Sequence, residues 1–210
     1  LTQTYRPEKA LTQLAKEGFF IACIEYRLSQ HAVFPACIHD CQLTVKYLRQ
    51  HNEELQIESD KIGVWGESAG AHLASLVGVN YNDDEECEVQ AVVSWYTPMD
   101  LTTMAVIEET EEENSVIAGL IGGKVVDHMD IARTASPITY TEKKLPPILL
   151  MHGDADKLVP YEQSVRFYEE AKKAGNEIEF ITVPGQGHGF FQGEEYYDAI
   201  REFLVKHLFY

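Results

Sequence analysis

The fold is decided by Lys61-Ile62-Gly63-Val64-Trp65-Gly66-Glu67-Ser68-Ala69-Gly70-Ala71-His72-Leu73-Ala74. Residues 62–65 form an apolar run that predicts a strand, and a helical pattern begins at Ser68. Between them lies Gly-x-Ser-x-Gly, which in a strand–turn–helix context is typical of a serine nucleophile on a tight turn. Glycines flank the serine and keep bulk away where backbone segments approach closely. We predict that Ser68 is a nucleophile and that the N–H of Ala69, at the helix start, stabilises an oxyanion.

The bulk composition is that of a globular protein. Of 210 residues, 45% are hydrophobic and 24% are charged, so one domain over residues 1–210 with a sizeable core is expected. The formal net charge of −17, from 17 basic and 34 acidic residues, argues against a nucleic-acid or anionic-membrane partner. No apolar stretch approaches membrane-spanning length. The acidic composition fits a protein that acts on neutral or cationic small molecules, and a need for solubility explains it equally well.

The cysteines do not form a disulfide framework. Cys23 lies in an apolar run, and Cys37 and Cys41 share one helical face, so all three are interpreted as small core residues. His39 lies between the latter two, but no ligand-rich segment follows, and neither a metal nor another cofactor is expected. This cysteine usage favours a reducing compartment such as the cytoplasm. The chain begins at Leu1 without methionine or signal-peptide pattern, and secretion stays open.

Strand-like and helical segments alternate along the chain. The expected strands cover residues 19–26, 62–65, 89–96, 148–151 and 178–183, and the expected helices cover residues 7–16, 35–51, 68–79, 161–174 and 194–208. Such alternation predicts an α/β fold with a mostly parallel sheet flanked by helices and with catalytic groups at the carboxyl ends of the strands. Residues 97–145 break the alternation and are expected to form a partial cap. Their acidic run at 108–113 is interpreted as solvated surface.

Three histidines compete for the role of the base that a serine nucleophile needs. His188 follows the last expected strand in a glycine-rich loop that can approach Ser68 closely, and it is favoured. His152, at the end of a strand before Gly153, is expected to hold the local turn. His72, one turn beyond the serine, is expected to pack rather than catalyse.

Two aspartates follow the expected strand at 148–151 and could orient the base. Asp156 lies deeper in the loop and is favoured over Asp154, which could instead shape the turn by accepting backbone N–H bonds. The resulting order of Ser68, Asp156 and His188 is the chain order of the α/β-hydrolase fold. Each of the three residues follows a different expected strand.

The chain resembles esterases of the hormone-sensitive-lipase-like or BD-FAE-like branch of the α/β hydrolases, a branch that includes acetyl and feruloyl esterase-like proteins. The similar segments lie at residues 25–29, 34–36, 66–74, 94–101, 135–140, 146–160 and 183–189. The resemblance spans nearly the whole chain and is weakest at residues 102–134. It implies the hydrolysis of short acyl esters, often of carbohydrates or small alcohols, and it implies that Asp156 is the triad acid.

One departure from the family concerns the start of the chain. Similar enzymes carry a His-Gly-Gly-Gly-type loop after their third strand, which completes the oxyanion hole, and this chain begins in the helix that would follow that loop. The N–H of Ala69 is then the one identifiable donor, and losing a donor costs roughly 10²–10³ in turnover. The family's third strand would lie between residues 19–26 and 62–65. We therefore expect a fold that is N-terminally incomplete and a sheet completed by a missing N-terminal segment or by a homo-oligomer.

Two other functions stay open at this stage. A missing oxyanion loop is compatible with a catalytically weak or inactive binding module that keeps the α/β-hydrolase fold. An oligopeptidase-like serine peptidase also carries the His-Gly-x-x-Asp pattern found here from His152 to Asp156. Such peptidases usually bring a large additional domain.

Overall fold

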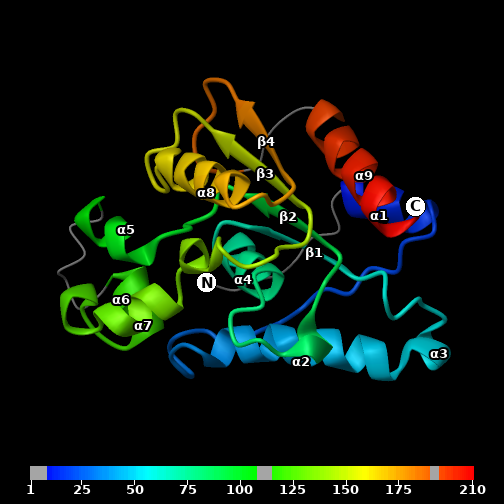
Figure 1. Cartoon of the computed structure of the whole chain (residues 1–210), viewed down its shortest axis with the longest axis horizontal. Coiled ribbons are helices and arrows are strands. Elements are labelled where there is room, and N and C mark those ends of the chain that lie inside the picture. Colours follow the sequence, from blue (N-terminus) through cyan, green and yellow to red (C-terminus); the bar gives the residue numbers. More distant parts are fainter. Residues whose placement is uncertain (1–8, 108–114, 190–193) are drawn as a thin grey trace.

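A parallel sheet forms the centre of the computed structural model, which describes residues 9–107, 115–189 and 194–210. The strands of this part of the chain are β1 (Gly63–Glu67), β2 (Ala91–Trp95), β3 (Ile148–Gly153) and β4 (Ile178–Val183), in the order β1-β2-β3-β4 (Figure 1). All three neighbouring pairs are parallel. Their carboxyl ends therefore meet at one edge of the sheet, as the α/β prediction requires.

Helices cover both faces of the sheet (Figure 1). The helices are α1 (Lys9–Lys16), α2 (Ala36–Gln50), α3 (Asn52–Leu55), α4 (Ala69–Gly78), α5 (Leu101–Ile107), α6 (Val116–Ile121), α7 (Met129–Thr134), α8 (Glu162–Lys173) and α9 (Glu194–Leu208). Short 3₁₀ turns lie at Glu85–Cys87, Val125–Asp127 and Pro137–Tyr140. A parallel sheet with helices on both faces agrees with the predicted α/β fold.

Alternating side chains of the central strands divide the core into two clusters. Val93 and Trp95 of β2 pack with Leu14 of α1 and Phe203 of α9 on one face. Val92 belongs to the cluster on the other face, with buried side chains of α2, α4 and α8. The alternation follows from the two-residue period of a strand. Strands β2 and β3 are buried throughout, which explains their continuous apolar sequences.

The predicted strand at residues 19–26 is wrong. This run pairs with no strand in the described part of the chain, where β1 has β2 as its one hydrogen-bonded neighbour. Phe20 is 52% exposed and Cys23 is exposed, so Cys23 is not a core residue. An apolar run becomes a strand only where another strand accepts its hydrogen bonds, and the hydrophobic pattern of a single segment does not reveal that partner. The other predicted strands and the five predicted helices agree with the structure to within two residues at the ends that it describes. Residues 7 and 8 of the first predicted helix lie outside the described residues.

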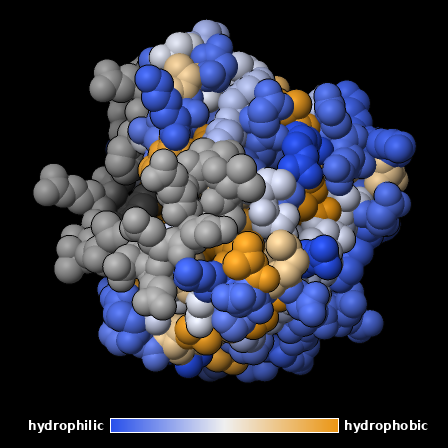
Figure 2. Space-filling view, turned by 90° about the vertical axis from the view of Figure 1, so that its left-hand side faces the viewer, coloured by the Kyte–Doolittle hydropathy of each residue, from blue (hydrophilic) through white to orange (hydrophobic). Residues whose placement is uncertain are grey.

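Residues 97–145 contain α5, α6 and α7, which lie to one side of the sheet (Figure 1). The acidic run at 108–113 lies outside the described residues. Where coloured atoms are visible, Figure 2 shows the molecule on this side as mainly hydrophilic, with apolar side chains in groups between polar ones. Coverage of the active site by this region stays a prediction. Across residues 9–107, 115–189 and 194–210, we find no helix whose length and apolar character would suit it to span a bilayer.

Candidate active site

Ser68 lies on a strained turn between β1 and α4. Its backbone has φ 51° and ψ −118°, a conformation that non-glycine residues rarely adopt. Its N–H donates to the carbonyl oxygen of Trp95 at 3.0 Å, which attaches the turn to the end of β2. Of the two flanking glycines, only Gly66 is sterically required, because a Cβ there would lie 2.2 Å from the carbonyl oxygen of Gly70. A Cβ on Gly70 itself would meet no atom within 4 Å.

His188 connects Ser68 to Asp156. Its Nε2 lies 2.9 Å from the Oγ of Ser68, and its Nδ1 lies 2.8 Å from the Oδ2 of Asp156. The three residues come from the ends of β1, β3 and β4, which the parallel sheet brings to the same edge. The residues favoured from the sequence thus form one hydrogen-bonded chain.

The carboxylate of Asp156 determines which ring nitrogen of His188 carries the hydrogen. Its side chain is fully buried, and its Oδ1 accepts the backbone N–H groups of Leu158 and Val159, each at 2.9 Å. Because a carboxylate oxygen can only accept, the hydrogen of a neutral His188 ring lies on Nδ1. Nε2 is then free to accept the hydroxyl proton of Ser68, as a general base requires.

Asp154, the alternative acid, has a different role. Its Oδ1 accepts the N–H of Gly185 at 2.6 Å, and the neighbouring Ala155 donates its N–H to the carbonyl oxygen of Gln186 at 3.0 Å. A Cβ on Gly153 would lie 2.2 Å from that same oxygen of Gln186. Asp154 therefore holds the loop of His188 against the loop that follows β3, which is the turn-shaping role considered for it from the sequence.

The other two candidate histidines are buried and hydrogen-bonded. The Nε2 of His72 lies 2.6 Å from the carbonyl oxygen of Ala135, and burial lowers the pKa of His72 to about 4. His152 is fully buried, with Nδ1 at 2.7 Å from the Oγ of Ser164 and Nε2 at 2.9 Å from the carbonyl oxygen of Val159. Burial also lowers the pKa of His152. Neither ring contacts Ser68, as the sequence analysis expected.

Tyr96 was not identified from the sequence, although it contacts the candidate base. Its ring meets the ring of His188 edge to face, with centroids 4.7 Å apart. Its hydroxyl donates to the Oε2 of Glu67 at 2.7 Å, and its backbone has a positive φ of 40°. The available signal was its position directly after β2, at the same edge of the sheet as the other candidates.

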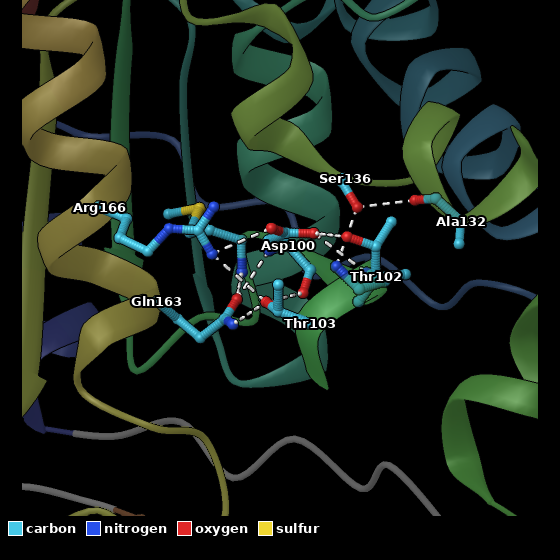
Figure 3. A network of polar contacts seen from close by, with 9 residues as sticks. Asp100, Thr102, Thr103, Ala132, Ser136, Gln163 and Arg166 are labelled. Carbon is cyan, nitrogen blue, oxygen red and sulfur yellow. Dashed lines mark hydrogen bonds and ion pairs between the residues drawn. The ribbon is translucent and has the colours of Figure 1, made fainter. Parts of the chain in front are cut away.

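A second feature that the sequence analysis missed is a polar network between α8 and the residues after β2 (Figure 3). The Oε1 of Gln163 accepts the backbone N–H groups of Met99 and Asp100 at 2.9 and 2.7 Å. Arg166 pairs with Asp100 at 3.1 Å, and Ser136 accepts the N–H of Leu101 at 2.9 Å. These bonds hold the first turn of α8, just beyond the loop of the candidate acid, against the start of α5.

The predicted oxyanion donor, Ala69, is the first residue of α4 and is exposed. The N–H groups of a first helical turn have no acceptor within the helix. The N–H of Ala69 is therefore suited to bind an oxygen that develops negative charge next to Ser68. The origin of a second donor stays a prediction.

Cys37, His39 and Cys41, which are close in the sequence, are not grouped as metal ligands in the described residues. Cys37 and Cys41 are buried, whereas the Nε2 of exposed His39 lies 2.9 Å from the hydroxyl of Tyr81. In the described ranges, one group with metal-ligand character has its ligand atoms within 4.8 Å of one another, namely Glu177, Glu179 and His207. The ammonium of Lys206 already lies 3.0 and 3.1 Å from the two carboxylates. This group shares no residue with the chain of Ser68, His188 and Asp156.

Comparisons with known proteins indicate the family of the chain. A family model described as BD-FAE matches residues 2–171. Esterase LipC of Mycobacterium tuberculosis is 28% identical over 190 residues, which cover 86% of this chain and 47% of LipC. This chain spans just under half the length of LipC and of the two next curated relatives.

Solved structures of esterases are similar as well. A truncated carbohydrate esterase from gut microbiota is 31% identical with a TM-score of 0.79, and the match covers 89% of this chain and 73% of that one. The propionate-bound esterase Est2 of Thermogutta terrifontis is 27% identical with a TM-score of 0.69. The match covers 87% of this chain and 70% of the Est2 chain. From the family match, the sheet and the hydrogen-bonded site together, we conclude that the chain belongs to the BD-FAE family and has the α/β-hydrolase fold.

Proposed function

We propose that this chain forms the catalytic part of a serine carboxylesterase that hydrolyses short acyl esters. The observation that carries the proposal is the hydrogen-bonded chain from Asp156 through His188 to Ser68, with the serine on a strained turn at a helix start. The proteins named above as esterases support the same reaction. No metal or cofactor takes part in the proposed mechanism.

In the first half of the reaction, the Oγ of Ser68 attacks the ester carbonyl carbon while Nε2 of His188 takes its proton. The carbonyl oxygen becomes an oxyanion, which the N–H of Ala69 stabilises. The tetrahedral intermediate then collapses. The bond to the alcohol oxygen breaks as Nε2–H donates its proton to that oxygen, and the acyl group stays on Ser68.

In the second half, water attacks the acyl group and gives a proton to the same Nε2. Collapse of the second intermediate returns the proton to Ser68 and releases the carboxylic acid. Throughout, Asp156 holds the Nδ1–H of His188 and stabilises the imidazolium that forms in each half. Its two backbone N–H bonds keep this carboxylate in place.

We propose small acyl groups on a neutral, carbohydrate-like alcohol as the substrate class. Support comes from the relatives, of which one is named a carbohydrate esterase and another was solved with propionate bound. The net charge of −17 also disfavours anionic substrates. A panel of p-nitrophenyl esters from acetate to decanoate, with acetylated xylo-oligosaccharides, tests this choice. Preference for decanoate would contradict it.

The reaction itself is tested by labelling with an organophosphate such as paraoxon. We expect one adduct, mapped by mass spectrometry to the peptide that contains Ser68 and absent from Ser68→Ala. Ser59→Ala, which changes a serine outside the site, serves as the matched control and should label like the parent protein. Labelling elsewhere, or turnover that survives in Ser68→Ala, would contradict the proposal.

A catalytically weak binding module remains the second candidate, and the fact that the N–H of Ala69 is the one oxyanion donor identified so far favours it. In the described residues, β2 is the one strand that pairs with β1, on one of its two edges. We propose that a further strand, from an N-terminal segment or a second subunit, completes the other edge and brings the second oxyanion donor. An oligopeptidase-like activity is the third candidate. Comparing p-nitrophenyl acetate with a peptide p-nitroanilide separates the three, because the binding module hydrolyses neither and the peptidase hydrolyses the anilide.

A further inference from the structure

The carboxylate of Asp156 faces two histidines rather than one. The Nδ1 of His188 lies 2.8 Å from its Oδ2, and the Nε2 of His152 lies 3.3 Å from the same oxygen. The two rings differ in exposure, since 18% of the side chain of His188 is exposed and none of that of His152 is. The reaction proposed above uses only the first ring.

The surroundings of His152 determine which of its nitrogens carries the hydrogen. Nε2 faces two acceptors, the carbonyl oxygen of Val159 at 2.9 Å and the carboxylate of Asp156. Neither can donate, so the hydrogen lies on Nε2. Nδ1 of the neutral ring then accepts the hydroxyl hydrogen of Ser164, 2.7 Å away on α8. The edge of Tyr161 packs against the ring, with centroids 5.8 Å apart.

These contacts place His152 at the point where the acid loop is held. Its Nε2–H bonds the carbonyl oxygen of Val159, and the N–H of Val159 bonds the Oδ1 of Asp156. The ring of His152 therefore holds Val159 in place, and Val159 in turn holds the carboxylate of Asp156. It also directs the positive end of an N–H dipole toward Oδ2, and because the ring is neutral this adds no second full positive charge beside His188.

We propose that His152 is a positioning residue for the esterase reaction, holding the 156–159 loop and the carboxylate of Asp156 where that carboxylate orients His188. This inference rests on the proposed function. His152 is not itself a base, because it is fully buried and both of its ring nitrogens are engaged. Its loss lets the carboxylate turn away from Nδ1 of His188, and misplacement of a reacting group by about 1 Å costs on the order of 100-fold in rate.

The test compares His152→Phe, which keeps a ring but removes both polar contacts, with His152→Gln, whose amide can again donate to Val159 and accept from Ser164. We expect kcat on p-nitrophenyl acetate to fall about 10- to 100-fold in His152→Phe with KM nearly unchanged, and to recover substantially in His152→Gln. His72→Gln is the matched control, because it alters a different buried histidine bonded to a carbonyl oxygen and should keep the parent kcat. Equal kcat in His152→Phe and the parent, or an equal fall in His72→Gln, would overturn the inference.

A second readout does not depend on turnover. The Nδ1–H proton of His188, bonded to a carboxylate, gives a far-downfield proton NMR resonance, which should persist in His152→Gln and disappear or shift upfield in His152→Phe. An unchanged resonance would overturn the positioning role even if the chain proved to be a poor esterase. Absence of turnover and of Ser68 labelling in the parent protein would instead contradict the proposed function. If His152→Phe does not fold, Ser164→Ala replaces it, with the same direction expected for the resonance and for kcat.

Discussion

Gly66 and Gly70 lie so close that a Cβ on Gly66 would stand 2.2 Å from the carbonyl oxygen of Gly70, whereas a Cβ on Gly70 would meet nothing within 4 Å. This one-sided contact predicts opposite effects of two similar substitutions. Gly66→Ala should destabilise the protein by about 3 kcal/mol or more, because the atom that it meets belongs to the backbone of α4. Gly70→Ala lies inside a helix and should raise stability by about 0.5–1 kcal/mol. Urea unfolding of both variants measures the difference, and equal destabilisation would contradict the geometry.

The two aspartates after β3 provide a second prediction. Asp156→Asn should lower kcat by about 10⁴-fold, because an amide can donate to His188 and favours the wrong tautomer. Asp154→Asn keeps the oxygen that accepts the N–H of Gly185, so its kcat should stay within about fivefold of the parent value. Kinetics with p-nitrophenyl acetate measure both. A larger fall in Asp154→Asn than in Asp156→Asn would reverse the assignment of the acid.

The contact between Gly153 and the loop of His188 gives a third prediction. A Cβ on Gly153 would lie 2.2 Å from the carbonyl oxygen of Gln186, so Gly153→Ala should push the loop and His188 away from Ser68. We expect a fall in kcat of about 100-fold. Gly187→Ala is the control within the same loop, because its nearest neighbour would be 3.8 Å away. Slower labelling of Ser68 in Gly153→Ala, but not in Gly187→Ala, checks the result without a substrate.

The lowered pKa of buried His72 leads to a prediction about how the stability of the protein depends on pH. Its pKa is lowered from 6.5 to about 4 by burial, so the unfolded chain binds a proton at higher pH than the folded protein does. The contribution of neutral His72 to the free energy of unfolding is fully present above about pH 6.5 and is lost as the pH falls toward about 4. The total loss is about 3 kcal/mol. In His72→Gln this contribution disappears. Urea unfolding from pH 4 to 7.5 should therefore give a smaller pH slope for His72→Gln, and identical slopes would refute the assignment.

Much of the fold and site could be predicted because the signals are local. The turn around Ser68 has its own motif, and Asp156 and His188 each lie in the loop that follows an apolar run, five residues after its end. In a parallel sheet the ends of such runs converge, so their proximity could be inferred without coordinates. The choice between Asp154 and Asp156 needed only the depth of each residue in the loop.

The parts that could not be predicted depend on partners distant in the sequence. Residues 19–26 have the composition of a buried strand, yet strand formation depends on a neighbour that the run itself does not encode. Gln163 bonds backbone groups 63 and 64 residues away, and nothing in its own segment marks it as a buried polar residue. The contact of Tyr96 with His188 likewise arises only in the assembled sheet, because the two residues follow β2 and β4, which β3 separates.

The pairing of α1 with α9 has a consequence for how the protein is synthesised. Glu17 and Arg201 form an ion pair across 184 residues, and Leu14 packs in the same cluster as Phe203 and Trp95. On the ribosome, α1 emerges well before α9 and can meet this partner only once the segment up to Leu208 has left the exit tunnel. Until then, the side chains of β2 and β3 on this face, including Trp95, lack the part of their cover that α9 provides. The cluster that contains Leu14, Trp95 and Phe203 can therefore form only after α9 has been synthesised, and chains that stall before α9 are expected to be substrates for quality control.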